Sequence, residues 1–109
     1  MKLRATEEFK DWLDHLRDRR GRSRILSRLF RLQDGNPGNA RSVGGGIVEL
    51  KIDFGPGYRV YYVQRGQVFV LLLCGGDKST QAKDIEQAKV LASQRIDMED
   101  ENDSQDFPF

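Results

Sequence analysis

Apolar residues recur at helical spacing directly after Thr6. They fall at positions i, i+3, i+4 and i+7 and predict one face of an amphipathic helix: Phe9, Trp12, Leu13 and Leu16. Thr6 is expected to cap this helix, with Glu7 and Glu8 in its first turn. The apolar face is expected to pack in the core, and His15, which lies off it, is expected to face solvent.

A second helix is predicted from Arg22, after a break between helices over 17–21. Its apolar positions also follow helical spacing: Ile25, Leu26, Leu29, Phe30 and Leu32. The helix is expected to end at Asp34 and Gly35, where glycine supplies the left-handed conformation of a C-cap. Because the break is short, the two helices are predicted to form an antiparallel hairpin.

From residue 47 onward the hydrophobic period changes from helical to alternating. Val48, Leu50 and Ile52 alternate with charged residues over 47–53, which predicts a half-buried strand. Further strands are predicted over 58–64 and 67–74, joined by a two-residue hairpin turn at Arg65 and Gly66.

The remaining segments are short. A first strand is predicted over 2–5, a turn over 36–39, and a flexible glycine entry at 44–46. Residues 75–79 are expected to form a loop. A last helix is expected to follow, capped by Ser79 or Thr80, with these residues on its inner face: Ile85, Ala88, Leu91 and Ala92.

The predicted order is therefore β-α-α-β-β-β-α, an α+β domain in which an N-terminal helical hairpin and a C-terminal helix pack on a small antiparallel-rich sheet. The domain is expected to span 1–95. The acidic tail 96–109 has too few apolar residues to offset the entropy cost of ordering and is expected to be disordered. An alternative is that the tail folds back on the basic face as a polyanion mimic.

Composition narrows the possible functions. One cysteine and one histidine exclude a disulfide scaffold and a zinc ribbon, and they exclude an ordinary Ser-His-Asp hydrolase unless His15 is the base. No metal or other cofactor is therefore expected. The longest apolar run, Val68 to Cys74, has seven residues, and a membrane span needs about 20. No signal-peptide core follows Met1, so a cytoplasmic protein without a membrane partner is expected.

Charge is distributed unevenly along the chain. Residues 1–96 hold all 18 basic residues and 11 acidic ones, a net charge of +7, whereas 97–109 carry −6. The window 17–31 holds seven arginines against one aspartate. A basic body is typical of proteins that bind polyanions, although a solvated surface is the alternative. The candidate RNA-binding residues are Arg20, Arg24, Arg28 and Arg31.

Candidate chemistry lies on the predicted strands. If Arg59 points outward, alternation places Lys51, Arg59 and Tyr61 on one concave sheet face beside Glu49, and Lys78 in the following loop overhangs it. Such a cluster of cations can stabilise the dianionic phosphorane that forms when an RNA 2′-hydroxyl attacks the adjacent phosphate. Glu49 or a lysine of depressed pKa would then be the base. The alternatives are that these cations are solvated, or that Arg59 pairs with Glu49 or Asp53 to hold the sheet.

Several segments resemble one protein family. They are Glu49-Leu50-Lys51-Ile52, the run from Gly55 to Tyr62, and the run from Leu71 to Gln81. With these residues the chain resembles a toxin of the RelE/ParE superfamily, closest to the HigB-like addiction module killer proteins. The resemblance covers about residues 5–92.

The resemblance implies a fold, an activity and partners. It implies the β-α-α-β-β-β-α toxin fold, a cognate antitoxin of helix-turn-helix type, and ribosome-dependent cleavage of mRNA by a metal-independent endoribonuclease. DNA would be contacted only through the antitoxin. Arg59 matches the family's phosphate-contacting arginine, Lys51 a strand lysine that assists catalysis, and Lys78 a basic residue of the last loop. The candidate catalytic residues are Arg59, Lys51, Lys78, Glu49 and Tyr61.

The same superfamily leaves other functions open. Glu49 stands where the ribonuclease members have another lysine, and Ile85 stands about where they have a functional tyrosine. Other members inhibit DNA gyrase without catalysis, and fold alone does not determine the target. A gyrase inhibitor, or a toxin that acts mainly as a co-repressor with its antitoxin, is therefore the alternative.

Overall fold

The computed structural model describes residues 1–95 and 105–107. Its elements follow the order β1 (Lys2–Ala5), α1 (Glu7–Asp14), α2 (Arg19–Gln33), β2 (Ala40–Gly44), β3 (Ile47–Ile52), β4 (Tyr58–Arg65), β5 (Phe69–Asp77), a 3-10 turn η1 (Lys78–Thr80), α3 (Gln81–Arg95) and β6 (Gln105–Asp106). The predicted α+β class and the order of its main elements are confirmed.

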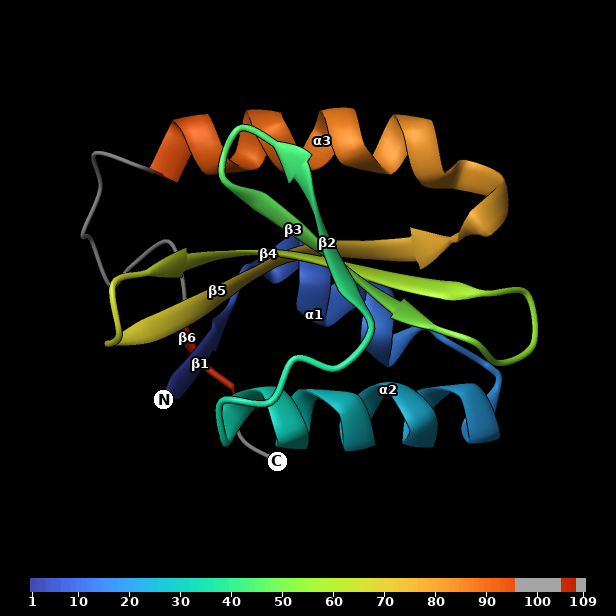
Figure 1. Ribbon diagram of the computed structural model, residues 1–109. Helices are drawn as coiled ribbons and strands as arrows, with labels where there is room; N and C mark the ends of the chain where they lie inside the picture. The colour runs from blue at the N-terminus through green and yellow to red at the C-terminus, as the bar shows by residue number, and fades with distance from the viewer. Residues whose placement is uncertain (96–104, 108–109) are drawn as a thin grey trace.

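One sheet forms the middle layer, with strand order β2-β3-β4-β5-β1-β6. Among the described strands, β1 and β5 pair in parallel, and the other neighbours are antiparallel. Helix α3 covers one face of the sheet, and α1 and α2 lie on the other (Figure 1). Within residues 1–95 and 105–107, no helix is long and apolar enough to cross a membrane.

The core has two parts because the sheet is covered on both faces. Phe9 and Leu13 of α1 pack with Ile25 and Leu29 of α2 against strand residues that include Tyr62. On the other face, α3 packs against a second group of strand residues, and its buried side chains confirm the predicted inner face of the last helix: Ala88, Leu91 and Ala92. The sheet face that was expected to carry Lys51, Arg59 and Tyr61 is therefore covered where α3 lies.

The caps explain where the first two helices begin. Thr6 Oγ1 accepts a hydrogen bond from the Phe9 N–H at 3.0 Å, which confirms the predicted cap of α1. The second helix starts at Arg19, three residues earlier than predicted, because Asp18 accepts from the Gly21 N–H at 3.0 Å. It ends at Gln33, with Asp34 as its C-cap, and Gly35 follows in the predicted left-handed conformation with a φ of 86°.

Strand boundaries differ more from the prediction. The short polar strand β2 was not predicted, and the segment 66–68 is a three-residue loop rather than a two-residue turn. The segment 75–77, predicted as loop, belongs to β5. Asp77, rather than Ser79 or Thr80, caps the turn that leads into α3, through a hydrogen bond from the Ser79 N–H at 2.8 Å.

Two glycines allow β5 to continue to Asp77. A Cβ on Gly75 would lie 2.3 Å from the Trp12 ring, and one on Gly76 would lie 1.9 Å from Asp84 Oδ2. The backbone of β5 therefore approaches α1 and α3 at distances that only glycine permits.

The expectation for the acidic tail falls mainly on 96–104 and 108–109, which lie outside the described residues. Within the tail, Gln105 and Asp106 form β6 and pair antiparallel with Ala5 and Arg4. The Phe107 N–H donates to the Leu3 carbonyl at 2.9 Å. This part of the tail therefore adds a strand to the outer edge of β1.

Candidate functional site

The predicted catalytic residues meet on β3 and β4. Lys51 is the cross-strand partner of Arg59, and Glu49 is the partner of Tyr61. Strand alternation thus brings these four residues together, as expected. Their exposure differs from the expectation, however, because Glu49 and Tyr61 are fully buried and Arg59 is only 6% exposed.

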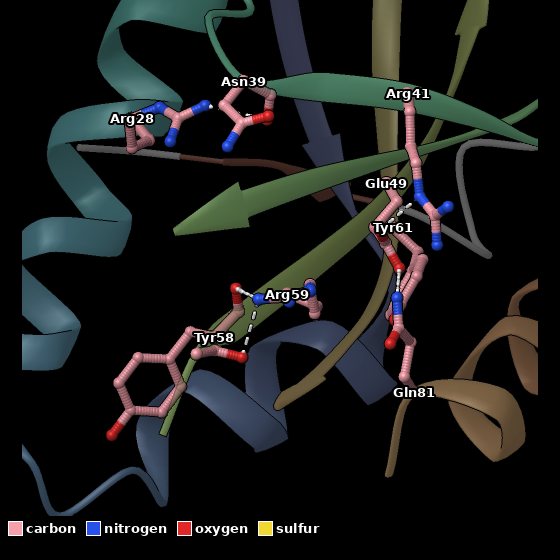
Figure 2. A network of polar contacts seen from close by, with 9 residues as sticks. Arg28, Asn39, Arg41, Glu49, Tyr58, Arg59, Tyr61 and Gln81 are labelled. Atoms are coloured by element: carbon pink, nitrogen blue, oxygen red, sulfur yellow. Dashed lines mark hydrogen bonds and ion pairs between the residues drawn. The ribbon is translucent and has the colours of Figure 1, made fainter. Parts of the chain in front are cut away.

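Arg59 is turned back onto the backbone of its own strand. Its Nη1 donates to the Gly57 carbonyl at 2.9 Å and to the Tyr58 carbonyl at 3.2 Å (Figure 2). Its Nε is buried and has no hydrogen-bond partner in the described part of the chain. The predicted alternative, a pair with Glu49 or Asp53, is not present among the described contacts. Arg59 is thus a buried cation with an unused donor.

Gly57 and Lys78 lie beside this arginine. Gly57 has a φ of 81°, and a Cβ on it would lie 3.2 Å from Arg59 Nη1 and 3.4 Å from Lys78 Cβ. Lys78 is exposed at the start of η1, and its Cβ lies, like the Arg59 guanidinium, beside Gly57. Asp77 adds a negative charge nearby: hydrogen bonds from Ser79 lower its pKa, and the charge of Arg59 adds to that effect.

Glu49 is the centre of a separate buried network. Its carboxylate accepts from Gln81 Nε2 at 2.7 Å, from Arg41 Nε at 2.9 Å and from the Tyr61 hydroxyl at 3.1 Å (Figure 2). Burial opposes ionisation, but these hydrogen bonds outweigh it and lower the pKa of Glu49. A buried carboxylate that is ionised and bound by three donors is a weak proton acceptor. The geometry therefore gives Glu49 a structural role rather than that of a base.

Tyr61 shares this interior position. Burial under α3 and the neighbouring charge of Glu49 raise its pKa. Its hydroxyl is bonded to Glu49 and its ring packs in the core, so it holds the network together and does not reach the surface. The surface-facing members of the predicted site are Lys51, which is half-buried, and Lys78.

The predicted RNA-binding arginines of α2 divide into two groups. Arg20, Arg24 and Arg31 are exposed, and the Arg24 guanidinium lies 4.9 Å from the centre of the Phe54 ring. Arg28 instead bonds backbone carbonyls of other segments. Its guanidinium donates to the carbonyls of Lys51, Pro37 and Asn39. Arg28 therefore fastens α2 to β3 and to the segment before β2.

Sequence reasoning missed Arg41 and Gln81. Arg41 lies on β2 opposite Glu49, and the glycine run at 44–46, three positive-φ residues that turn β2 into β3, was the signal that could have revealed the hairpin. Gln81 is the first residue of α3, and no sequence pattern marks it as a partner of Glu49.

The environments of Cys74 and His15 do not indicate a catalytic role. Cys74 is buried, and burial raises the pKa of its thiol to about 12. His15 is exposed, as predicted, and its Nδ1 donates to the Asp11 carbonyl at 2.7 Å. Across the part of the chain that the structure describes, no group of three or more His, Cys, Asp or Glu side chains is arranged to hold a metal ion.

Two comparisons with known proteins place the chain among relatives. A family model described as phage derived protein Gp49-like matches residues 11–97. A protein of Haemophilus influenzae strain Rd, described as uncharacterized, is 51% identical over 94 residues, which cover 86% of this chain and 95% of the relative.

Proposed function

The chain belongs to the Gp49-like family of phage-derived proteins, a toxin-like family, and from this premise we propose that it is the toxin of a toxin–antitoxin module. We propose further that it inhibits translation by cleaving mRNA on the ribosome, as the HigB-like resemblance implies. The partners would then be a cognate antitoxin, of helix-turn-helix type, and the ribosome with its mRNA.

The observation that carries this proposal is the state of Arg59. Arg59 is a buried guanidinium that forms no ion pair among the described residues and has an unused donor at Nε. Arginine offers a planar fork for phosphate oxygens, and Lys78 and Lys51 supply point charges next to it. The ligand that best completes this arrangement is a phosphate group.

The proposed reaction needs no added group. The RNA 2′-hydroxyl gives its proton to water and attacks the adjacent phosphorus, the bond to the 5′-oxygen breaks, and that oxygen takes a proton from water. The products are a 2′,3′-cyclic phosphate and a 5′-hydroxyl. Arg59 and Lys78 would stabilise the extra negative charge of the phosphorane. Because its three donors make Glu49 a weak base and Lys51 acts as a cation, we propose that water takes the proton of the 2′-hydroxyl.

The exposed arginines of α2 support the proposal that the target is a large polyanion. Arg20, Arg24 and Arg31 lie on one helix, and their side chains are exposed. Contacts of this kind with RNA backbone position a protein without reading sequence. They fit a ribosome-bound toxin.

The test is induction of the protein without an antitoxin, followed by mapping of mRNA 5′ ends and of plasmid supercoiling. We expect new 5′ ends within coding regions that vanish in Arg59→Lys, since lysine lacks the bidentate fork. Glu86→Gln, an exposed change on α3, is the matched control. Growth arrest with unchanged mRNA ends and altered supercoiling would replace the proposal with gyrase inhibition.

A further inference from the structure

Arg41 is an exposed cation whose direction is set by a buried carboxylate. It lies on the edge strand β2, opposite Glu49 on β3. Its Nε donates to Glu49 Oε1 at 2.9 Å, and most of the remaining side chain is open to solvent (Figure 2). Tyr61 and Gln81 bind the second oxygen of this carboxylate, Oε2. Glu49 therefore presents one oxygen, Oε1, to the edge strand.

The outer part of the Arg41 guanidinium is unused. Within residues 1–95 and 105–107, Nη1 and Nη2 of Arg41 form no hydrogen bond, because the contact with Glu49 is made through Nε. A guanidinium that is already oriented loses less conformational freedom when it binds a ligand. Two N–H groups that point the same way suit an anion that presents two oxygens, such as phosphate.

Strand pairing places Arg41 on the same face of the sheet as Arg59. Arg41 is the cross-strand partner of Glu49. Two residues further along β3, Lys51 is the cross-strand partner of Arg59. With strands about 4.8 Å apart and a rise of about 3.3 Å per residue, the Cα atoms of Arg41 and Arg59 lie about 12 Å apart. Lys51 lies between them, so the three cations form a row that matches a strand of successive phosphates.

We propose that Arg41 binds a second phosphate of the RNA, next to the phosphate that Arg59 and Lys78 hold in the proposed reaction. This inference rests on the proposed function, and it adds a residue that binds the RNA away from the reacting atoms. Glu49 then acts on binding as well as on stability, because it orients the guanidinium of Arg41. A contact of this kind holds the RNA backbone in place without reading its sequence.

The first measurement is the affinity for a labelled single-stranded oligoribonucleotide, followed by fluorescence anisotropy at increasing salt. Arg41→Gln should weaken binding about 10-fold at low salt and should lower the slope of log K against log salt by about 0.7, the value for one phosphate of a single strand. Arg41→Lys keeps the charge and should keep the slope. Arg17→Gln is the matched control, because it removes an exposed arginine between α1 and α2, on the other face of the sheet, and should change neither quantity (Figure 1).

The salt slope separates RNA binding from a merely structural role. Arg41→Gln also removes a partner of Glu49, so it should lower the melting temperature. Loss of that partner alone would weaken binding in parallel at all salt concentrations. An unchanged slope in Arg41→Gln, or a wild-type protein that does not bind the oligoribonucleotide, would therefore overturn the proposal.

The second measurement is mRNA cleavage on programmed ribosomes. Arg41→Gln should raise KM and leave kcat within about 2-fold of wild type, since uniform binding affects KM alone. A lower kcat with an unchanged KM would overturn the proposed role of Arg41. If the wild type cleaves no mRNA although its binding of RNA depends on Arg41, the proposed reaction fails and the phosphate contact stands.

Discussion

Arg41 and Glu49 join an edge strand to the interior through one contact, in which Arg41 Nε donates to Glu49 Oε1 at 2.9 Å. The Arg41 side chain is 53% exposed, whereas that of Glu49 is fully covered. Because Tyr61 and Gln81 bind the same carboxylate, Glu49 connects β2, β4 and α3 at a single point. The network thereby fixes the strand that carries Arg59.

Glu49→Gln is expected to lower the free energy of unfolding by about 1–3 kcal/mol at pH 7, since it weakens three hydrogen bonds to a buried charge. The folded-state pKa of Glu49 lies below its usual value of 4.5. Its stabilising contribution is therefore complete above the unfolded pKa and is lost as the pH falls through the lower folded pKa. Urea unfolding between pH 3 and 7 should show the gap between wild type and variant closing toward acid pH. A gap that is constant over this range would contradict the prediction, and Glu86→Gln should show no gap.

Arg59→Ala is expected to reduce mRNA cleavage by purified ribosomes about 10²–10³-fold, the loss typical of one donor to a developing oxyanion. The variant also leaves the Gly57 and Tyr58 carbonyls without their donor, so the free energy of unfolding should fall by about 1–3 kcal/mol. Arg59→Lys should keep more of the stability and little of the cleavage. A folded Arg59→Ala protein that still cleaves at the normal rate would remove this residue from the site.

Replacing Arg24 and Arg31 with Gln is expected to weaken ribosome binding and to flatten its salt dependence. The slope of log K against log salt should fall by roughly 0.7–0.9 for each phosphate that the protein no longer neutralises. Arg28→Gln should instead lower the melting temperature and leave the slope unchanged, because its donors are used on backbone carbonyls of the protein. Equal slopes for wild type and the double variant would indicate a merely solvated surface.

Gly75→Ala is expected to cost about 1–3 kcal/mol of stability, since the new methyl group overlaps the Trp12 ring. Trp12→Leu should relieve this overlap, so the double variant should be more stable than the sum of the single changes predicts. A double-mutant cycle by urea denaturation measures the coupling. Additive costs would show that the strand backbone shifts to accommodate the methyl group.

Cys74 is expected to resist alkylation in the native protein. Burial raises the pKa of its thiol to about 12, so the reactive thiolate is scarce at neutral pH. Iodoacetamide labelling at neutral pH should proceed only as fast as the protein opens, and should become rapid in urea. Rapid labelling of the folded protein would mean that β5 opens locally.

Local sequence patterns predicted the elements whose periodicity matches their packing. The i, i+3, i+4 spacing around Leu13 and the alternation around Leu50 each reflect one apolar face against the core. The placement of Lys51 and Arg59 on one sheet face also followed from strand alternation, whereas their register as direct partners came from the structure. These are properties that a short window of sequence determines.

The burial of Glu49 and Arg59 could not be predicted in this way. A charged residue in an alternating strand is expected to face solvent, and here α3 packs on that face while the Arg41 side chain reaches Glu49 from the edge strand β2. The partners of Glu49 come from residues 41, 61 and 81, so the network exists only after three distant segments have assembled. Likewise, the glycines at 75 and 76 are typical of a loop until the positions of Trp12 and Asp84 are known.

Because β1 pairs in parallel with β5, this part of the sheet can form only late in the synthesis of the chain. Lys2 pairs with Phe69, so β1 leaves the ribosome long before its neighbour, across a separation of 67 residues. At about 5–20 residues per second, β1 waits roughly 3–13 s for that partner. When β4 has been synthesised, it still lacks its neighbour β5, and Arg59 has neither Lys78 nor α3 beside it. The nascent protein therefore acquires its proposed site only when nearly the whole domain has been translated.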